Sequence, residues 1–429
     1  MEQATENAMI VGLHLNDRPQ ADFDYSMDEL AALAEACHIT VVGRLTQKAQ
    51  RINPSHYIGT GKIDELRAIA DAHEVETIIF NDELSPSQIR NLEADLERKV
   101  IDRTILILDI FAERAQTREA QLQVEIARLQ YMLPRLVGLR ASLSRQGGGG
   151  GAGLRNRGAG ETKLELDRRR IEERITMLQH ELNRLVATRQ TQRMKRKKNE
   201  VPVVCLVGYT NTGKSSLMNA MLRYTDPETT KEVFVKNMLF ATLETSVRNI
   251  ELPDKKSFLL TDTVGFVSQL PHHLIKAFRS TLEEVTEADL LVHVVDYSSE
   301  DYDKLIEVTN QTLEDIGTTG IDMLYVFNKC DLTDHPYPVV NGNQVYMSVR
   351  EGAGLEELIN CIRKELFSDY VKCRVLIPYE QGNVVSYFNE HAQIFGTEYE
   401  EGGTRLEMEC SQVDFERYKE HFIDLTVLS

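Results

Sequence analysis

A glycine-rich stretch near the middle of the chain carries the residue types that bind phosphate. The segment VPVVCLVGYTNTGKSS, residues 201–216, places an apolar run before a loop that matches the pattern G-x-x-x-x-G-K-S. Glycines let the backbone turn so that its N–H groups face a phosphate, and the start of the next helix adds partial positive charge. In this pattern Lys214 reaches the β- and γ-phosphates, and the Ser215 hydroxyl can ligate Mg²⁺. We predict nucleotide contacts from Gly208, Tyr209, Thr210, Asn211, Thr212, Gly213, Lys214, Ser215 and Ser216.

A second motif follows the strand-like SFLLTD and has the form D-x-x-G. A carboxylate at that point can hold Mg²⁺ through water, and a glycine N–H can meet the γ-phosphate. We predict nucleotide contacts from Asp262, Thr263, Val264 and Gly265, with Asp262 also serving the metal. The pattern D-x-x-G by itself is weak evidence. It supports a nucleotide site here because its order and spacing relative to the phosphate loop match a GTPase fold.

Two later motifs indicate that the base is guanine. Asn328-Lys329-Cys330-Asp331 follows the apolar run MLYVF, and the Asp331 carboxylate can accept from the N1–H and 2-amino groups that guanine has and adenine lacks. Lys329 is expected to lie along the ring. Ser348 and Val349 follow QVYM, where a backbone N–H can meet the guanine O6, although most such GTPases have alanine at the Val349 position. The motifs together predict a GTP-binding site.

A switch threonine should lie between the phosphate loop and Asp262. The segment FATLET offers Thr242 and Thr245, and we favour Thr242 as the residue that completes the Mg²⁺ shell. The metal ligands are then Ser215, Thr242 and Asp262, and the predicted catalytic residues are Lys214, Thr242 and Gly265. The expected cofactor is Mg²⁺, with GTP as the substrate.

The elements that must position these residues divide the chain into four parts. Residues 1–112 alternate between strand-like and helix-like segments, which predicts an α/β domain with a mostly parallel sheet. Residues 113–199 read as a helical hairpin, 200–367 as the GTP-binding domain and 368–429 as a small α+β domain of the order β-α-β-β-α. The fold class is α/β: a P-loop GTPase domain preceded by an α/β domain with an antiparallel helical hairpin and followed by a small α+β domain.

The predicted hairpin has apolar residues at helical spacing on both arms. Each arm should bury its stripe against the other. The first stripe is Leu122, Ile126, Leu129, Met132 and Leu133, and the second is Leu164, Leu166, Ile171, Ile175, Leu178, Leu182 and Leu185.

The tip that joins the two arms is rich in glycine and arginine. Five successive glycines hold no conformation by themselves, since glycine loses the most entropy on ordering. A local excess of positive charge in an acidic chain indicates a polyanion such as RNA. A plain solvated linker is the alternative. The predicted RNA-contacting loop is Arg145, Gly147, Gly148, Gly149, Gly150, Gly151, Arg155 and Arg157, and further basic residues flank it at Arg135, Arg140, Arg168, Arg169, Arg170, Arg193, Lys195, Arg196, Lys197 and Lys198.

The composition of the 429 residues is that of an ordinary soluble protein, with 42% hydrophobic and 27% charged residues. The net charge of −18 argues against a globally basic nucleic-acid binder but leaves room for a local basic face. Six scattered cysteines without a C-x-x-C pair fit a reducing cytosol. No apolar run is long enough to span a membrane; the strongest, TILILDIFA, is interrupted by Asp109. We expect a cytoplasmic monomer, associated in part with membranes.

The whole chain resembles the HflX family of bacterial ribosome-associated, ribosome-splitting GTPases. The resemblance is carried by YIGTGKIDEL, by SRQGGGG and GAGETKLELDRRRI in the hairpin, and by GYTNTGKSSLMNAM, LFATL and DTVGF. It implies that the N-terminal domain and hairpin bind the large ribosomal subunit, with the loop on rRNA near the peptidyl-transferase centre. It also implies GTP-dependent dissociation of stalled or hibernating ribosomes under stress.

One position in the GTPase motifs predicts slow intrinsic hydrolysis. Many GTPases place glutamine directly after D-x-x-G to orient the attacking water, whereas this chain has Phe266. A phenyl ring cannot hydrogen-bond water, so a partner, for which the ribosome is the obvious candidate, must order the missing group.

Two alternative functions remain open from the sequence. The chain can be a GTP-regulated adaptor for RNA or protein that does not split ribosomes. It can also carry a second, ATP-binding site, because Gly59-Thr60-Gly61-Lys62 opens a predicted helix. We favour a glycine turn capped by that helix, since the fragment lacks the full loop length of the phosphate-binding motif.

Overall fold

The computed structural model describes residues 6–146, 154–197, 201–225, 239–240, 245–268, 284–318 and 320–427. The chain forms two compact units. The first contains residues 1–194, 236–244 and 265–281, and the second contains residues 195–235, 245–264 and 282–429. Within the described part of the chain, no helix combines the length and the apolarity that a bilayer-spanning segment requires.

The first unit begins with an all-parallel sheet in the strand order β2-β1-β3-β4. Alternation of strands and helices allows parallel pairing, because each helix carries the chain back across the sheet. Ser85 forms a capping box with Gln88, which places the start of a helix at the predicted Ser85-Pro86. The elements are β1 Glu6–Leu15, α1 Gln20–Ala36, β2 Ile39–Ala49, α2 Thr60–Ala72, β3 Thr77–Phe80, α3 Pro86–Leu96, β4 Lys99–Asp102 and α4 Arg103–Arg114.

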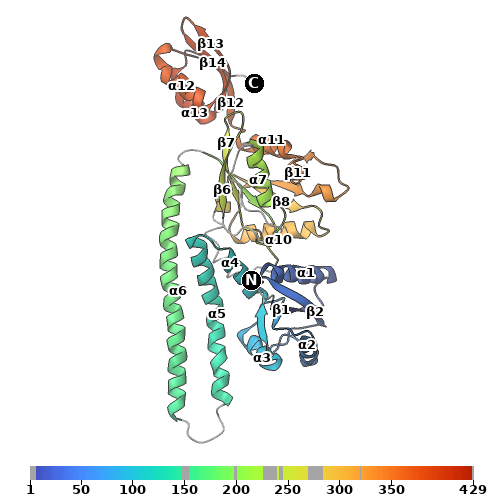
Figure 1. The fold of residues 1–429 in the computed structure, drawn as a ribbon. Coiled ribbons are helices and arrows are strands. Elements are labelled where there is room, and N and C mark those ends of the chain that lie inside the picture. Colours follow the sequence, from blue (N-terminus) through green and yellow to red (C-terminus); the bar gives the residue numbers. More distant parts are fainter. Residues whose placement is uncertain are drawn as a thin grey trace, which may run out of the picture. The chain divides into compact units, whose positions relative to one another are not determined.

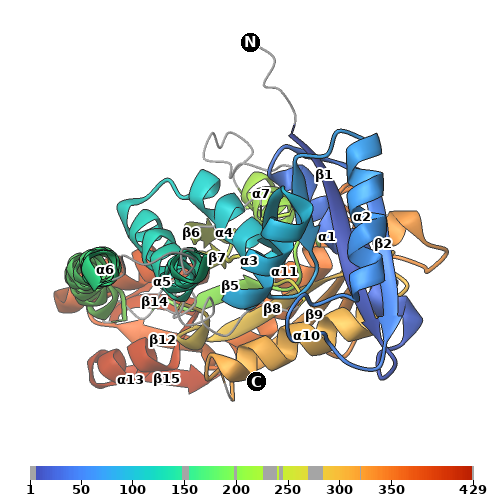
Figure 2. The same cartoon turned by 90° about the horizontal axis from the view of Figure 1, so that it is seen from below.

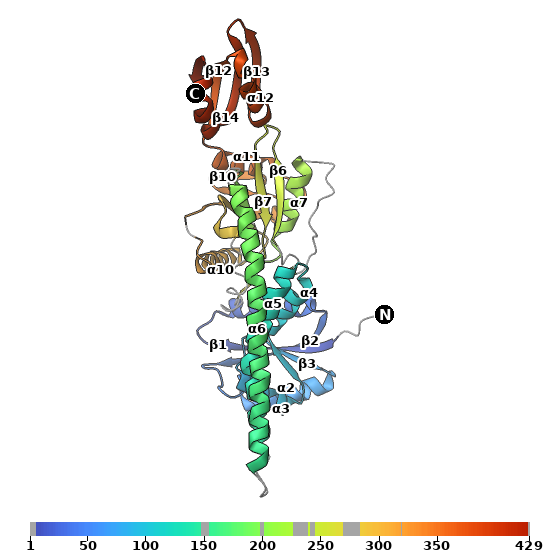
Figure 3. The same ribbon diagram turned by 90° about the vertical axis from the view of Figure 1, so that its left-hand side faces the viewer.

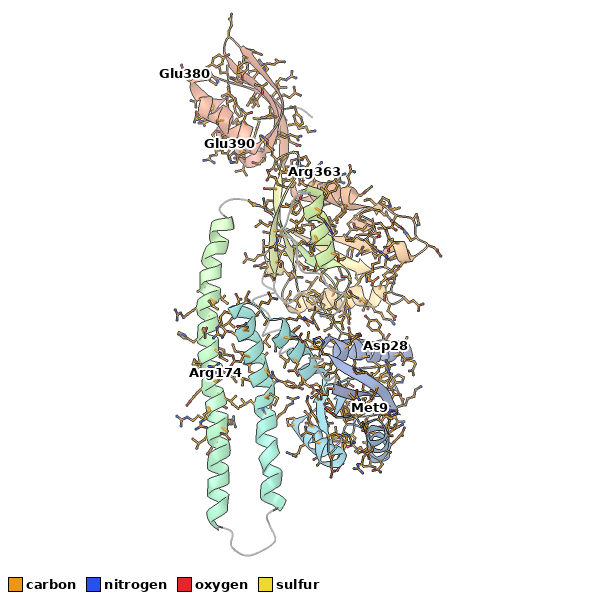
Figure 4. The ribbon with its side chains drawn as sticks, viewed as in Figure 1. Met9, Asp28, Arg174, Arg363, Glu380 and Glu390 are labelled. Atoms are coloured by element: carbon orange, nitrogen blue, oxygen red, sulfur yellow. The ribbon has the colours of Figure 1, made fainter. Side chains whose placement is uncertain are left out.

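Two long helices complete the described core of this unit. Helices α5, Arg118–Gln146, and α6, Leu154–Lys197, run side by side in opposite directions (Figures 1 and 2). Their contact is an apolar cluster built from both helices, as the periodicity predicts. Arg174 of α6, which Figure 4 labels, pairs with Glu125 of α5 at 2.8 Å. The cluster comprises Leu122, Ile126, Ile175 and Leu178, with Leu129, Ile171, Leu182 and Leu185 packed against it.

The second unit contains a seven-stranded sheet in the order β10-β11-β9-β8-β5-β7-β6. The five central strands are parallel, and β6 and β10 are antiparallel edge strands. The carboxyl ends of parallel strands meet at one edge, where ligands bind in open α/β sheets. The elements are β5 Val203–Val207, α7 Lys214–Thr225, β6 Ser246–Glu251, β7 Ser257–Asp262, β8 Leu290–Asp296, α10 Tyr302–Asp315, β9 Asp322–Asn328, η1 Cys330–Leu332, β10 Val339–Asn341, β11 Gln344–Tyr346 and α11 Leu355–Leu366.

The same unit ends in a small antiparallel sheet in the order β13-β14-β12-β15, with α12 beside it in Figure 3. Its core lies between the sheet and its helices and includes the buried Phe388, Leu406 and Phe415. The elements are β12 Tyr370–Ile377, η2 Tyr379–Gln381, α12 Gly382–His391, β13 Gln393–Glu400, β14 Gly403–Ser411, α13 Gln412–Tyr418, η3 Lys419–His421 and β15 Asp424–Val427.

The structure differs from the sequence prediction at four places. The run TILILDIFA forms part of α4, a helix that was not predicted and whose start is capped by Asp102. Strands β10 and β15 were also not predicted, because three or four residues carry too little periodicity to be seen. Leu166, predicted to lie in the buried stripe of the hairpin, is 53% exposed, so the described stripe on α6 begins later, at Ile171.

Candidate functional site

The phosphate loop lies between β5 and α7 and depends on two glycines. Gly208 and Gly213 have φ of +139° and +101°, a region that side chains other than glycine rarely adopt. A Cβ at Gly208 would overlap the Val294 carbonyl oxygen, and one at Gly213 would overlap Asn328 Nδ2. The loop therefore needs glycine for its backbone conformation and for close packing against two neighbouring strands.

Lys214 begins α7 and folds back over the loop. Its Nζ donates to the carbonyl oxygens of Gly208, at 3.0 Å, and Tyr209, at 2.6 Å. Burial lowers the pKa of Lys214 to about 8, although the nearby Asp262 opposes this shift. A buried ammonium that donates to two carbonyl oxygens is well placed to be stabilised further by phosphate oxygens.

Ser215 and Asp262 meet where the predicted metal site should lie. The Ser215 hydroxyl donates to Asp262 Oδ2 at 2.6 Å, although 47 residues separate them in sequence. Asp262 is fully buried at the end of β7, and the adjacent Thr263 donates to the Leu206 carbonyl oxygen at 2.6 Å. A hydroxyl and a carboxylate are hard oxygen ligands of the kind that Mg²⁺ prefers, so these two residues fit the ion.

The segment that follows D-x-x-G is held by the first unit. Residues 265–268 belong to that unit by their contacts, and Phe266 is 3% exposed. The guanidinium of Arg103 donates to the Ser268 carbonyl oxygen at 3.1 Å and to its hydroxyl at 3.2 Å. Arg103 and Ser268 also both bond Glu29. Because the Phe266 ring is buried and apolar, it offers no hydrogen bond to a water.

The first unit also holds part of the segment that precedes the predicted switch threonine. The ring of Phe240 packs edge-on against Phe111 of α4, with 4.7 Å between the centroids. Phe240 is 2% exposed and has a φ of +52°. Thr242 lies outside the described residues, and its role in the metal shell stays a prediction.

The base-reading motif is assembled from the ends of β9 and β11. The Asn328 side chain donates from Nδ2 to the Thr212 carbonyl oxygen at 2.9 Å, and its Oδ1 accepts from the Val349 N–H at 3.0 Å. The Ser348 hydroxyl donates to Asp331 Oδ1 at 2.7 Å, which orients that carboxylate. The sequence-predicted residues of the phosphate loop, the base motif and the Ser348-Val349 pair are therefore brought together by direct bonds.

Asp296 is a residue of this site that the sequence reasoning did not assign. It ends β8, and its Oδ2 accepts from Lys329 Nζ at 2.6 Å. The sequence signal was present, since an aspartate directly follows the apolar run LLVHVV at a strand end. The sequence did not show which residue Asp296 would bond, because Lys329 lies 33 residues away.

The hairpin arginines divide into groups with different surroundings. Arg135 was predicted as part of the basic flank, and this is wrong: its side chain is buried and bonds the Leu84 carbonyl oxygen at 2.9 Å, with Asp102 at 3.4 Å. Arg168, Arg169 and Arg170 pair with acidic residues of their own helix. The loop Gly147, Gly148, Gly149, Gly150 and Gly151 lies outside the described residues, as do the side chains of Arg140, Arg145, Arg155, Arg157, Arg193, Lys195, Arg196, Lys197 and Lys198.

The segment considered as a second nucleotide site forms the start of α2. The Gly59 N–H donates to Gln47 Oε1 at 2.9 Å, and Lys62 pairs with Glu65 at 2.8 Å. A Cβ at Gly61 would meet nothing within 4 Å, so no close backbone approach requires glycine there. These contacts favour the glycine turn at a helix start over the alternative of an ATP site.

Three family models match successive parts of the chain. Residues 24–112 match "GTP-binding GTPase N-terminal", and residues 114–196 match "GTP-binding GTPase Middle Region". Residues 203–329, which carry the phosphate loop and the base motif, match "50S ribosome-binding GTPase". Together they cover more than half of the sequence.

Relatives are similar over most of their length. A protein named GTPase HflX from Caldanaerobacter subterraneus subsp. tengcongensis is 44% identical over 398 residues, 93% of this chain and 90% of that protein. GTPase HflX of Escherichia coli K12 is 36% identical over 423 residues, 96% of each chain. Among solved structures, a GTP-binding protein from Sulfolobus solfataricus in complex with GDP is 24% identical, with a TM-score of 0.42 and coverage of 85% of this chain and 99% of that chain.

Proposed function

The chain belongs to the HflX family of GTPases, and from this premise we propose that it binds the large ribosomal subunit and promotes dissociation of stalled or hibernating ribosomes under stress. The observation that carries the proposal is the match of residues 203–329 to a 50S ribosome-binding GTPase model. Relatives that share the HflX name over more than nine-tenths of this chain support it.

Within this proposal the site residues take specific roles in hydrolysis. Lys214 and the backbone of residues 208–216 hold the β- and γ-phosphates, and the Gly265 N–H meets the γ-phosphate. Asp331 reads guanine, while Lys329 covers the ring. Ser215 and Asp262, with Thr242, hold Mg²⁺, which supplies charge neutralisation at the phosphates when it is bound. The buried Phe266 cannot hydrogen-bond the attacking water, so we propose that the ribosome supplies or orders the group that does.

The hairpin is the proposed ribosome-binding element. Residues 113–199 contain 20 lysine and arginine residues against 9 aspartate and glutamate residues, in a chain of net charge −18. Within the described residues, arginines such as Arg118, Arg128 and Arg174 are already paired with carboxylates. The tip, with Arg145, Arg155 and Arg157 around the glycine loop, is therefore the part we assign to rRNA near the peptidyl-transferase centre. We also propose that the protein is monomeric and cytoplasmic.

Sedimentation of intact ribosomes tests the function. Purified 70S ribosomes are incubated with the protein and either GTP, a non-hydrolysable analogue or GDP, and are then resolved on a sucrose gradient. We expect the 70S peak to fall and the 30S and 50S peaks to rise with GTP or its analogue, but not with GDP. Co-sedimentation with 50S subunits at low salt without dissociation would support ribosome binding but contradict ribosome splitting, and no co-sedimentation would favour a GTP-regulated adaptor for another RNA or protein.

A further inference from the structure

We infer that Asp296 is a positioning residue for guanine recognition, which acts by holding the Lys329 side chain in place before the nucleotide binds. This deepens the proposed function and rests on the assignment of Lys329 to the guanine ring. The two residues lie at the ends of neighbouring parallel strands, where Asp296 of β8 is in register with Asn328 of β9.

Both oxygens of the Asp296 carboxylate are committed to local bonds. Oδ1 accepts from the Ser298 N–H at 3.1 Å and from the Ser298 hydroxyl at 2.6 Å. Oδ2 accepts from Lys329 Nζ at 2.6 Å. A carboxylate fixed on one side by Ser298 cannot rotate freely, so its second oxygen presents one preferred position to the lysine.

The backbone on both sides of this ion pair is also held. The Tyr297 N–H donates to the Asn328 carbonyl oxygen at 2.9 Å, which joins the two strand ends. The Tyr297 ring stands edge-on to Phe327, at 5.5 Å, and to Tyr346, at 5.3 Å. Lys329 has a φ of +66°, a conformation that is uncommon for a residue with a side chain and persists where its surroundings determine it.

Holding this lysine in advance has a physical benefit for binding. A free lysine side chain is a flexible four-carbon stem, and ordering it on binding opposes affinity. With Nζ bonded to Asp296, the lysine side chain has less freedom left to lose when a base binds against it. The lysine side chain is 26% exposed and the aspartate side chain 21% exposed, so the pair is partly shielded from solvent.

An ordinary surface ion pair is the competing explanation, and it predicts a different result. Such a pair contributes little to stability and nothing to nucleotide affinity. The chain offers a matched control in Asp301, whose carboxylate pairs with Lys304 at 2.7 Å in the same domain. Asp301→Asn removes a similar charge and a similar ion pair without touching Lys329.

The experiment compares Asp296→Asn, Ser298→Ala and Asp301→Asn in the full-length protein. Fluorescent GDP is used to measure Kd and the dissociation rate, and single-turnover hydrolysis is measured at saturating GTP. We expect Asp296→Asn to raise Kd about fivefold, mainly through faster dissociation, with the hydrolysis rate unchanged. Ser298→Ala should shift Kd about twofold in the same direction, and Asp301→Asn should match the wild type.

A double-mutant cycle tests whether Asp296 acts through Lys329. In the Lys329→Met background, Asp296→Asn should cause no further loss of affinity. An unchanged Kd for both Asp296→Asn and Ser298→Ala, or the same loss from Asp296→Asn with and without Lys329, would overturn the inference. Asp331→Asn separates this outcome from failure of the site itself: if that variant keeps guanine preference, the assignment of the base site is wrong.

Discussion

The Ser215 hydroxyl bonds directly to Asp262 Oδ2 at 2.6 Å, which joins the end of the phosphate loop to the end of β7. Both atoms are oxygens of the kind that Mg²⁺ prefers, so an ion bound here would replace this direct bond with bonds to itself or to its waters. The same pair therefore provides the first test of the site.

Removing either oxygen should weaken Mg²⁺ binding, so that GTP hydrolysis requires a higher Mg²⁺ concentration. We expect Ser215→Ala and Asp262→Asn to raise the Mg²⁺ concentration for half-maximal hydrolysis about tenfold, since each loses one metal or metal–water contact. Steady-state phosphate release across a magnesium titration measures this. Ser257→Ala, at the start of the same strand as Asp262, should leave the titration unchanged. Unaltered magnesium requirements in both site variants would contradict the assignment.

Changing Asp331 should change the preferred base. The carboxylate accepts from two donors of guanine, whereas an asparagine amide can donate to the carbonyl that xanthine has at the same place. Asp331→Asn should weaken GTP binding about 100-fold and strengthen xanthosine triphosphate binding. Competition against fluorescent GDP measures both affinities. The exposed Asp334→Asn is the control and should behave as the wild type.

The pH dependence of nucleotide binding should report Lys214. In the nucleotide-free protein its pKa is lowered to about 8, mainly by burial, and phosphate oxygens should raise it again in the complex. Above pH 8 the Lys214 amine then takes up a proton when GDP binds. The Kd for GDP should therefore be constant from pH 6.5 to about 7.5 and rise by up to about tenfold per pH unit above 8. A fluorescence titration between pH 6.5 and 9 measures this.

The variant Lys214→Met controls for ionisation of the nucleotide itself. It should bind more weakly at every pH and lack the rise that belongs to the lysine. The same lowered pKa predicts that the nucleotide-free protein gains stability as pH rises from about 8 toward 10.5, because the unfolded chain retains the proton in that window. If Kd for GDP changed with pH in the same way in the wild type and in Lys214→Met, the lysine would not change its protonation on binding.

Charge removal at the hairpin tip should reduce ribosome binding without affecting the nucleotide. Replacing Arg145, Arg155 and Arg157 by glutamine should lower the affinity for large subunits and reduce the slope of log affinity against log salt by about 2. Replacing Arg168, Arg169 and Arg170 is the matched control, because those three already pair with carboxylates on α6. Filter binding to 50S subunits at several salt concentrations measures both.

Deletion of residues 147–157 tests the same element more severely. It should abolish subunit dissociation and leave the Kd for GDP nearly unchanged. Lost GTP binding in this deletion would count against a separate role for the hairpin.

The carboxylate of Asp102 should be important for the stability of the first unit. It accepts from the backbone N–H groups of Leu84 and Ile105 and from the Tyr131 hydroxyl, and it lies beside Arg135. Asp102→Asn removes the buried one of the two carboxylates beside the Arg135 guanidinium and leaves only the more exposed Glu83 at 3.9 Å, which should cost about 3 kcal/mol.

Denaturant unfolding and hydrogen exchange in α5 measure that loss. Asp109→Asn provides the comparison, since Asp109 is 38% exposed and pairs with Arg128 at 3.2 Å. That variant should cost less than about 1 kcal/mol. Equal stability of the two variants would show that the bonds of Asp102 to Tyr131 and Arg135 do not anchor α5.

Much of the fold and most of the nucleotide site could be predicted from local patterns. The GTPase prediction depended on properties of short segments. These are glycines that need positive φ, apolar runs before each motif, and the spacing of Lys214, Asp262 and Asp331. Helical periodicity likewise predicted the contact between α5 and α6, because an apolar stripe specifies which face is buried.

Partnerships over long distances in sequence were decided only by the tertiary structure. A motif does not say that Asp296 will hold Lys329, that Arg135 will be buried beside Asp102, or that Leu166 will face solvent. The physical reason is that charge and polarity are local properties of a residue, whereas burial and pairing depend on which distant element packs against it. Composition and spacing determined what chemistry this chain can do, and packing decided which arginines and carboxylates are free to do it.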